Sequence, residues 1–328
     1  MVSKPFFVPI ASGKGGVGKS ILAANLAVAL ANSGHSVIAI DLDLGGSNLY
    51  SYLGLENIYA GIGDYLISKK GKLKDYLVQA GMPNLKYLAA DHRVPFLANI
   101  GYAQKVKLIN EIKNLQADYI VMDLGAGTTF NTLDYFDFST NGLVVTTFEK
   151  PAILNTLSFI KNFIHRVALK EIKQNSTINA DINRAYKNLT GDDFLTIKDI
   201  ISIAEKVDTA LASKIVALTR SYQPRIIFNR GNHPDQLEVC NSLQSSIQKY
   251  LSIDLCFFGF LFEEDPAKLS SLQSYSLLRR YPESVLSKGI NDISKRIVKF
   301  NNRIIANSSG MLINDTREKF EMWNSQQE

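Results

Sequence analysis

The chain has 328 residues, of which 46% are hydrophobic and 20% are charged, and its formal net charge is +5. This balance is typical of a globular protein and excludes a disordered chain. The longest apolar stretches fall well short of the roughly 20 residues of a membrane-spanning helix, and two cysteines are too few for a disulfide framework. Because the apolar start at Pro5–Ala11 is also too short for a secretory signal, we expect a cytoplasmic protein.

Apolar runs alternate along the chain with segments of helical period, a pattern typical of β-α-β units and a parallel sheet. Several runs lack polar alternation, as strands covered on both faces do. The predicted strands span Phe6–Ala11, Ser36–Asp41, Leu85–Ala89, Tyr119–Asp123, Leu143–Phe148, Arg225–Asn229 and Leu255–Leu261. The predicted helices span Ser20–Asn32, Ala103–Leu115, Ile153–Lys173, Pro234–Leu251 and Pro282–Ala306. We therefore predict an α/β fold with a mostly parallel, twisted sheet and helices on both faces.

Residues 1–308 are predicted to form one domain and residues 309–328 a C-terminal tail. Within the domain, the more polar segment 174–221 is interpreted as a helical insertion before the strand that follows it. The tail carries Asp315 and Glu318 in capping-box spacing, which predicts a short helix there. Pro9 lies inside the first predicted strand, where it cannot donate a ladder hydrogen bond, so we expect a bulge.

The segment from Gly13 to Ser20 reads GKGGVGKS and fits the pattern G-x-x-x-x-G-K-[ST] between a predicted strand and a predicted helix. Its glycines let backbone N–H groups surround phosphate oxygens, and the start of the helix adds unpaired N–H groups. Because Lys19 can reach the β- and γ-phosphates and Ser20 can bind Mg²⁺, the segment predicts a site for ATP with magnesium. The predicted nucleotide-binding residues of this segment are Gly13, Lys14, Gly15, Gly16, Val17, Gly18, Lys19, Ser20 and Ile21.

With Ser12 in front of it, the same segment resembles the deviant Walker A loop of the MinD/ParA ATPases. The mark of that family is a second lysine near the start of the loop, which Lys14 matches. The resemblance implies a P-loop NTPase fold of the SIMIBI type. It also implies that Lys14 reaches across a dimer to the partner's nucleotide, and that Lys14 and Lys19 both act in catalysis.

A second segment, Asp41–Asn48, reads DLDLGGSN at the end of the next predicted strand, on the same sheet edge as the glycine loop. Asp41 and Asp43 point the same way from one strand, so repulsion between their charges favours a nearby cation. The segment resembles switch I of the family. The resemblance implies that Asp41 assists Mg²⁺, that Asp43 positions the attacking water, and that Asn48 supports the switch and the nucleotide.

A third segment, Tyr119–Gly127, is an apolar strand that ends in an aspartate followed by glycines, and it resembles the family's Walker B strand and switch II. The resemblance implies that Asp123 holds Mg²⁺ through water and that the backbone at Gly127 approaches the γ-phosphate. Together with Ser20 and Asp41, Asp123 completes the predicted metal site. Gly125 stands where the commonest form of the family has proline, so the stiffness of this loop is in question.

Two shorter matches complete the predicted nucleotide site. Glu149 and Pro151 follow the fifth strand and resemble the family segment that approaches the partner subunit, although any strand-to-helix loop can carry this pattern. Asn229 ends a predicted strand and resembles the asparagine that reads adenine, because its amide can donate and accept on that base edge. An asparagine that only caps the strand is the alternative.

The resemblance covers roughly residues 5 to 300 and implies an ATPase that dimerises when it binds Mg-ATP and is released by slow hydrolysis. It implies ATP and ADP as ligands, a homodimer, and an activator or cargo protein as partner. The cargo would be flagellar or polar machinery, the division site or partitioned DNA. The segments Asp41–Asn48 and Gly125–Thr128 look most like those of the flagellar-number and pole-determining MinD-like ATPases.

Other functions remain open at this point. A nucleotide-responsive binding module with negligible hydrolysis would keep every phosphate contact, and an amide-forming ligase of the same superfamily would share the loop. An iron–sulfur carrier or reductase needs clustered cysteines, and Cys240 and Cys256 alone do not supply them.

Two surfaces bear on the partner. One predicted helix carries four cations, which form either a weak DNA contact or a solvated helix face; they are Lys161, Arg166, Lys170 and Lys173. The last predicted helix carries an apolar stripe, which either packs on the sheet or meets a membrane surface; it consists of Ile290, Ile293, Ile297, Phe300 and Ile304. The expected location is therefore the cytoplasm, with a peripheral position at a membrane or cell pole left open.

Overall fold

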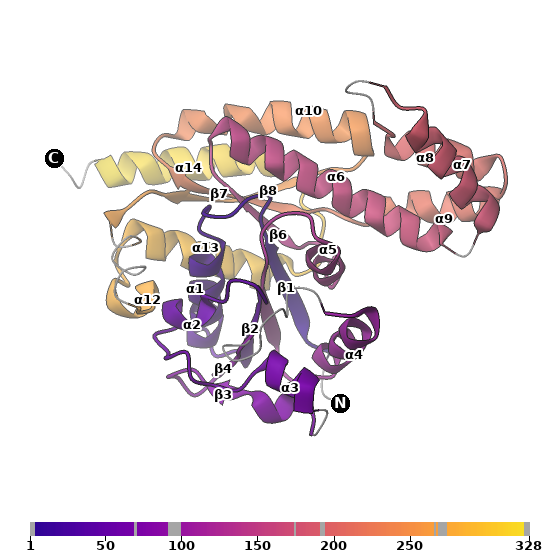
Figure 1. The fold of residues 1–328 in the computed structure, drawn as a ribbon. Helices are drawn as coiled ribbons and strands as arrows, with labels where there is room; N and C mark the ends of the chain where they lie inside the picture. The colour runs from indigo at the N-terminus through magenta and orange to yellow at the C-terminus, as the bar shows by residue number, and fades with distance from the viewer. Residues whose placement is uncertain are drawn as a thin grey trace.

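The centre of the fold is an eight-stranded sheet in the order β3-β4-β2-β5-β1-β6-β7-β8 (Figure 1). The computed structural model describes residues 4–68, 71–90, 100–173, 175–190, 194–265, 267 and 274–324. The strands are β1 (Phe6–Ala11), β2 (Val37–Leu42), β3 (Val78–Gln79), β4 (Leu85–Leu88), β5 (Tyr119–Leu124), β6 (Leu143–Thr146), β7 (Arg225–Gly231) and β8 (Cys256–Phe262). All neighbouring pairs are parallel except β3 and β4.

This sheet confirms the predicted fold class, and each of the seven predicted strands corresponds to an observed one. The strand that sequence analysis missed is β3, which has only two residues and pairs at the edge of the sheet with β4. An element this short leaves no readable period in the sequence.

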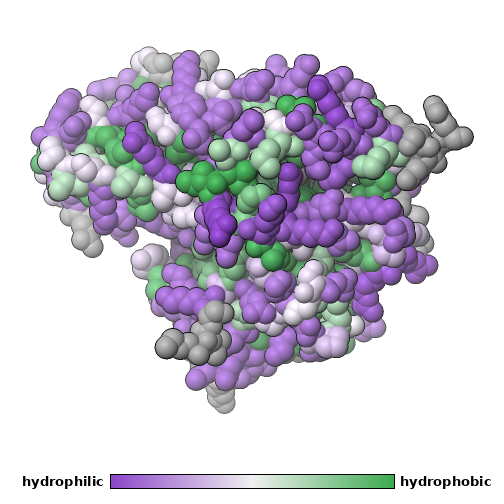
Figure 2. Space-filling model, turned by 180° about the vertical axis from the view of Figure 1, so that it is seen from behind, coloured by the Kyte–Doolittle hydropathy of each residue, from purple (hydrophilic) through white to green (hydrophobic). Residues whose placement is uncertain are grey.

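Helices cover both faces of the sheet, as the continuous apolar strands require. One face is covered by α1 (Lys19–Asn32), α2 (Leu49–Tyr52), α12 (Leu277–Arg280) and α13 (Val285–Phe300). The other face is covered by α3 (Ile62–Ser68), α4 (Tyr102–Lys113), α5 (Phe130–Phe136), α6 (Lys150–Ile172), α10 (Val239–Leu251) and α14 (Ser308–Asn324). Two short 3-10 helices lie between these elements, with η1 (Leu73–Tyr76) between α3 and β3 and η3 (Pro234–Glu238) between β7 and α10. The reverse side of the molecule is mostly polar, with apolar side chains in small groups (Figure 2).

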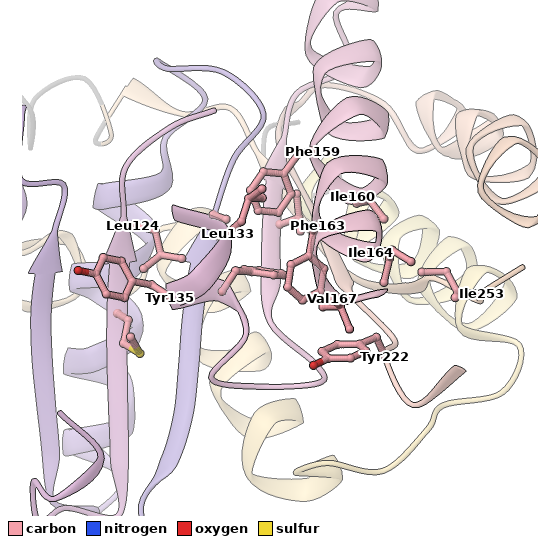
Figure 3. Close-up of a cluster of buried hydrophobic side chains, with 14 of the residues drawn as sticks. Leu124, Leu133, Tyr135, Phe159, Ile160, Phe163, Ile164, Val167, Tyr222 and Ile253 are labelled. Atoms are coloured by element: carbon pink, nitrogen blue, oxygen red, sulfur yellow. The ribbon is translucent and has the colours of Figure 1, made fainter. Parts of the chain in front are cut away.

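Helix α6 contributes the largest apolar face to the second layer (Figure 3). Phe159 and Phe163 both meet the ring of Phe136 from α5 edge-on, with centroids 5.1 and 4.8 Å apart. Phe163 also meets Tyr222, which precedes β7, at 5.2 Å. These contacts tie the helix after β6 to the helix after β5, so two helices that begin at the same sheet edge are held together.

The predicted insertion at 174–221 is helical, with α7 (Ser176–Lys187), α8 (Ile197–Glu205) and α9 (Thr209–Arg220). Helices α8 and α9 pack on α6, and α7 packs on α8, as Figure 1 shows. Each of them begins at an Asn, Thr or Asp that caps its first turn, namely Asn175, Thr196 and Asp208. Residues 174 and 191–193 lie outside the described part of this segment.

The C-terminal segments pack on the sheet. Ile290, Ile293 and Ile297 of α13 are buried against α1 and β8, so this part of the apolar stripe belongs to the core. Helix α14 begins at Ser308, earlier than the short helix predicted near Asp315, and packs on β8 with Leu312 buried.

The domain boundary at residue 308 stays a prediction, and residues 325–328 of the predicted tail lie outside the described residues. Among the described helices, none combines the length and apolar composition of a membrane span.

The bulge expected at Pro9 was a wrong prediction. β1 pairs with β5 in continuous register from Phe6 to Ile10. Phe6 donates its N–H toward β5, and because alternate residues of a parallel strand face the same neighbour, Pro9 faces β6 instead. β6 pairs with β1 only from Ile10 onward, so the missing N–H of Pro9 falls just before that ladder begins.

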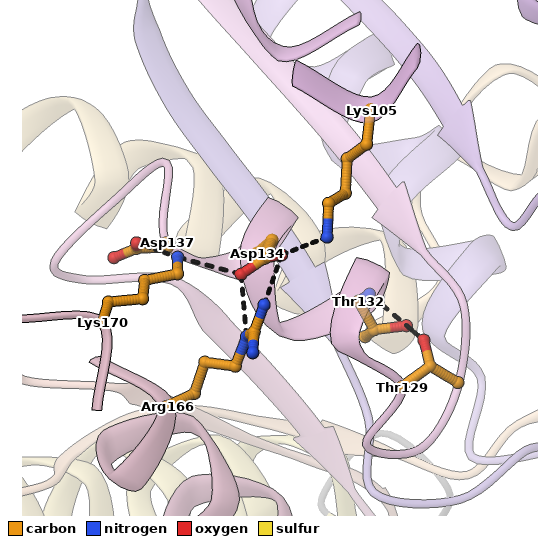
Figure 4. Close-up of polar contacts among 7 residues, drawn as sticks. All are labelled: Lys105, Thr129, Thr132, Asp134, Asp137, Arg166 and Lys170. Carbon is orange, nitrogen blue, oxygen red and sulfur yellow. Dashed lines mark hydrogen bonds and ion pairs between the residues drawn. The ribbon is translucent and has the colours of Figure 1, made fainter. Parts of the chain in front are cut away.

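A buried carboxylate, Asp134 of α5, joins three helices (Figure 4). It accepts hydrogen bonds from Lys105 of α4 at 2.5 Å and from Arg166 of α6 at 2.9 and 3.0 Å. Lys170 of α6 forms ion pairs with Asp134 at 2.9 Å and Asp137 at 2.8 Å. Burial alone would raise the pKa of Asp134, but the hydrogen bonds from Arg166, Lys105 and Lys170 lower it well below its usual range.

We expect the substitution Asp134→Asn to destabilise the protein at pH 7 by about 3–5 kcal/mol, because Lys105 would stay buried without its partner. The depressed pKa of Asp134 means that its stabilisation is present above the unfolded-state pKa of about 3.9 and is lost as pH falls below it. Urea unfolding at neutral and acidic pH measures both effects. The control is Asp137→Asn, whose carboxylate is more exposed; equal losses in the two variants would contradict the prediction.

Candidate functional site

The loop between β1 and α1 is closely packed against two other elements. Gly16 and Gly18 have φ angles of 81° and 90°, in the left-handed region that favours glycine. A β-carbon on Gly18 would lie 2.2 Å from the side-chain amide of Asn229 at the end of β7. A β-carbon on Gly13 would lie 2.3 Å from the backbone carbonyl of Asn155 in α6. The glycines therefore permit both the turn of the loop and its contact with its neighbours.

Lys19 opens α1 and points toward the end of β5. Its ammonium lies 2.5 Å from Oδ1 of Asp123 and 3.4 Å from the hydroxyl of Ser20. Burial opposes the charged form of Lys19, but attraction to Asp123 and the hydrogen bond between them outweigh burial and raise its pKa. Lys19 is thus a charged group held at the floor of the loop.

Two buried aspartates lie side by side on neighbouring strands. Asp41 of β2 is in register with Asp123 of β5, and both side chains are fully buried. Asp41 accepts hydrogen bonds from the hydroxyl of Ser47 at 2.7 Å, the N–H of Asp43 at 3.1 Å and the N–H of Leu49 at 3.2 Å. Burial and the nearby charge of Asp123 raise the pKa of Asp41 to about 7. The segment predicted as switch I is therefore anchored on Asp41.

The donor set fits Mg²⁺. Within the described residues, Oδ2 of Asp123 is buried and has no hydrogen-bond partner. Ser20 stands next to Lys19, and Asp41 faces Asp123, so hydroxyl and carboxylate oxygens converge here. The part of the chain that is described contains no group of three or more His, Cys, Asp or Glu side chains placed to hold a metal ion. The protein would therefore supply only some of the ligands of a metal ion here. Mg²⁺ suits such a site because it is usually held by one or two carboxylates together with phosphates and water.

Asp43 is half-buried at the rim of the site. The backbone N–H of Gly46 donates to the carbonyl of Asp43 at 3.1 Å. Burial raises the pKa of Asp43, and the charge of Lys19 partly opposes that shift. A β-carbon on Gly125 would lie 3.5 Å from Oδ1 of Asp43, an ordinary contact, so this position has room for a β-carbon. Asn48, also at this rim, donates from its side chain to the carbonyl of Gly46 at 2.9 Å.

The segment predicted as switch II touches the glycine loop. Gly127 has a φ of 83°, and its N–H donates to the carbonyl of Ser12 at 2.9 Å. Just after it, the hydroxyl of Thr129 caps α5 by accepting from the N–H of Thr132 at 3.2 Å. The segment therefore lies between β5 and a helix that the Asp134 cluster fixes in place.

The structure brings Lys14 and Glu149 together within one chain. The ammonium of Lys14 donates to Oε2 of Glu149 at 2.8 Å, and the hydroxyl of Thr147 donates to the same oxygen at 3.0 Å. Hydrogen bonds from Lys14 and Thr147 lower the pKa of Glu149. The reach of Lys14 across a dimer stays a prediction.

Asn229 supports the glycine loop. Its side-chain amide donates to the carbonyl of Val17 at 2.8 Å, so the end of β7 is attached directly to the loop. Contact of Asn229 with adenine stays a prediction, and Asn229 also lines the adjoining pocket.

A pocket of about 600 Å³ runs from the loop toward β8 and α13. The predicted site residues among its lining are Gly15, Gly16, Gly18, Lys19, Ser20, Ile21, Asp43, Asn48 and Asn229. The other predicted residues lie around the pocket and take part in the contacts described above. They are Gly13, Lys14, Val17, Asp41, Asp123, Gly127 and Glu149. All the predicted residues therefore gather at one sheet edge.

Sequence analysis missed one side of the pocket. These residues come from α2, β7, the end of β8 and α13, and are Tyr52, Arg230, Leu261, Phe262, Glu263, Glu264, Ala267, Leu286 and Ile290. The available signal was the position of β8, because the carboxyl ends of parallel strands meet where ligands bind. No motif marks the individual residues, so only the packing of β8 and α13 reveals them.

Comparisons with known proteins agree with this geometry. The family described as CobQ/CobB/MinD/ParA nucleotide binding domain matches residues 8–321. The septum site-determining protein MinD of Synechocystis sp. is 29% identical over 234 residues, which are 70% of this chain and 82% of that protein. MinD of Helicobacter pylori is 40% identical over 121 residues, 37% of this chain and 44% of that protein, so the chain spans less than half of that relative. The flagellum site-determining protein YlxH of Helicobacter pylori is 33% identical over 160 residues, covering 47% of this chain and 52% of that protein.

Solved structures share the fold. The MinD cell division protein of Aquifex aeolicus superposes with a TM-score of 0.55 at 22% identity, covering 90% of this chain and 97% of that one. The septum site-determining protein MinD of Pyrococcus horikoshii, complexed with Mg-ADP, superposes with a TM-score of 0.56 at 19% identity, covering 92% of this chain and all of that one. These likenesses confirm the predicted sheet and its covering helices.

We expect the substitution Gly13→Ala to destabilise the protein by about 1–3 kcal/mol, because its β-carbon would collide with the backbone of α6. The matched control is Gly15→Ala, since a β-carbon on Gly15 meets no atom within 4 Å. Thermal and urea unfolding without nucleotide compare the two variants. If Gly13→Ala were as stable as Gly15→Ala, the close packing of the loop on α6 would be refuted.

Proposed function

Because the chain belongs to the CobQ/CobB/MinD/ParA nucleotide-binding family, we propose that it is an ATPase that uses Mg-ATP as a dimerisation switch. In this proposal, ATP lies in the pocket between the loop Gly13–Ser20 and β8. Binding of ATP allows two copies to associate, and slow hydrolysis releases them. The switch controls the spatial position of a cellular cargo.

One observation carries the proposal. Lys19, Asp41 and Asp123 converge on one point at the floor of the glycine loop, where an unpartnered carboxylate oxygen of Asp123 remains among the described residues. A glycine loop alone would explain a turn, and a buried ion pair alone would explain stability. Their meeting at the carboxyl edge of a parallel sheet is what a phosphate and its metal require.

The residues divide the chemistry between them. The backbone of the loop and Lys19 bind the phosphate chain, and Ser20, Asp41 and Asp123 hold Mg²⁺ directly or through water. Bound there, Mg²⁺ would supply positive charge beside the phosphates. Asp43 lies at the rim, near enough to the pocket to orient an attacking water. Phosphoryl transfer depends mainly on such positioning and charge.

Exposed groups beside the site support association with a second copy. Phe130 and Leu154 lie near the starts of α5 and α6, and 68% and 54% of their surfaces are exposed. These helices follow Gly127 and Glu149, so the apolar side chains lie on segments next to those that touch the loop. Burying them in a dimer would gain hydrophobic stabilisation and would bring Lys14 toward a second nucleotide.

The cargo is proposed from the relatives and from the surface. Two relatives carry the names septum and flagellum site-determining proteins, which favours positioning of division or polar machinery. The four cations of the predicted helix Ile153–Lys173, considered above as a DNA contact, already interact with other side chains of this chain. Arg166 and Lys170 pair with Asp134, while Lys161 lies 3.9 Å from the ring of Phe194 and Lys173 lies 5.4 Å from that of Tyr102. This arrangement weighs against a dedicated DNA surface.

We expect Asp43→Ala to bind ATP but to lose hydrolysis and accumulate as a dimer, because the water-orienting carboxylate is gone while the loop remains. Lys19→Ala should lose ATP binding and stay monomeric with ATP. Phosphate release, equilibrium binding and light scattering with and without Mg-ATP measure these outcomes, on variants whose unfolding transitions show that they are folded.

An Asp43→Ala protein that binds ATP yet stays monomeric would refute the dimerisation switch. A wild-type protein that binds ATP but releases no more phosphate than Asp43→Ala would instead support the binding module with negligible hydrolysis.

A further inference from the structure

β7 contains a bulge where it reaches the pocket. Phe228 pairs with Phe260 and Gly231 pairs with Phe262, so three steps along β7 match two steps along β8. Asn229 and Arg230 are the residues inside this bulge. Successive side chains of a regular strand point to opposite faces, yet both of these residues line the same pocket. The bulge therefore turns Arg230 toward the pocket, a common role of bulges near binding sites.

The backbone at this position is unusual and firmly held. Arg230 has a φ of 57°, in the left-handed region that side chains other than glycine rarely adopt. Before it, Asn229 is bonded to the carbonyl of Val17 at 2.8 Å. After it, Glu263 donates its N–H to the carbonyl of Gly231 at 2.9 Å. A β-carbon on Gly231 would lie 2.0 Å from the ring of Phe260, so the bulge must end on glycine.

The guanidinium of Arg230 is available for a ligand. Within the described part of the chain it is exposed and makes no hydrogen bond or ion pair. The pKa of Glu149, which hydrogen bonds from Lys14 and Thr147 lower, is lowered further by the charge of Arg230. Glu149 is itself bonded to Lys14 of the glycine loop. Arg230 thus lines the same pocket as the glycine loop, within electrostatic range of the pair that Lys14 forms with Glu149. Among the described lining residues, the other cation is Lys19, which is already paired with Asp123.

We propose that Arg230 binds the phosphate chain of the nucleotide, as a second cationic contact opposite the glycine loop. This inference rests on the proposed nucleotide-binding function and adds a residue to that site. The planar guanidinium matches phosphate oxygens and forms charge-assisted hydrogen bonds with them. Arg230 is not a glycine, yet its backbone is strained, and no partner among the described residues stabilises its side chain. Binding of a ligand by this side chain explains why the strain is retained.

The substitution Arg230→Gly tests this contact without threatening the fold, because glycine adopts the observed φ readily. We expect Arg230→Gly to be at least as heat-stable as the wild type without nucleotide. Its affinity for both ATP and ADP should fall by roughly tenfold or more, the usual value of a charge-assisted hydrogen bond. Isothermal titration calorimetry measures the affinities.

Two further measurements separate a charge contact from a structural effect. Arg230→Lys should recover part of the lost affinity, because it restores the positive charge. The ratio of wild-type to Arg230→Gly affinity should shrink when salt is raised from about 0.1 M to about 1 M, since salt screens an exposed contact.

Unchanged ATP and ADP affinity in Arg230→Gly would overturn the inference while leaving the proposed function in place. An Arg230→Lys variant no better than Arg230→Gly, or an affinity ratio independent of salt, would also overturn it. A wild-type protein without measurable affinity for either nucleotide would refute the proposed function itself.

Discussion

The ion pair between Lys19 and Asp123 joins the start of α1 to the end of β5 at the middle of the sheet. It is buried together with Asp41, so three charged groups share a region from which water is largely excluded. The cluster holds two carboxylates and only one ammonium, so its negative charge is not balanced. Burial and the charge of Asp123 raise the pKa of Asp41 to about 7. Such a cluster costs stability unless a ligand completes it, which is why its position at the glycine loop is informative.

The loops around this cluster are held at defined points. Asp41 anchors the segment after β2 through Ser47 and Leu49, and Gly127 is bonded to Ser12 at the start of the glycine loop. Beyond Gly127, the Asp134 cluster attaches α5 to α4 and α6. The short segments between these anchors are therefore held at both ends.

The outer side of the pocket depends on long-range packing. Phe262 at the end of β8 lines the pocket and stacks on Phe320 of α14 at 6.1 Å, with Trp323 at 5.3 Å. The segment expected to be a tail therefore contributes a helix behind the pocket wall. In the same region the bulge in β7 places Arg230 on the pocket, and the local sequence of β7 marks this bulge only by Gly231, since a glycine within a strand often marks one.

The sequence by itself determined the parallel sheet and the convergence of Lys19, Asp41 and Asp123. Each follows from local rules, namely continuous apolar strands, a glycine loop before a helix, and carboxylates at strand ends that meet at one sheet edge. Only the tertiary structure decided the pairing of Lys14 with Glu149, the strand register that leaves Pro9 without a ladder hydrogen bond to donate, and the wall of the pocket formed by β8 and α13. These features join residues far apart in the chain, and their energies depend on neighbours that no local pattern encodes.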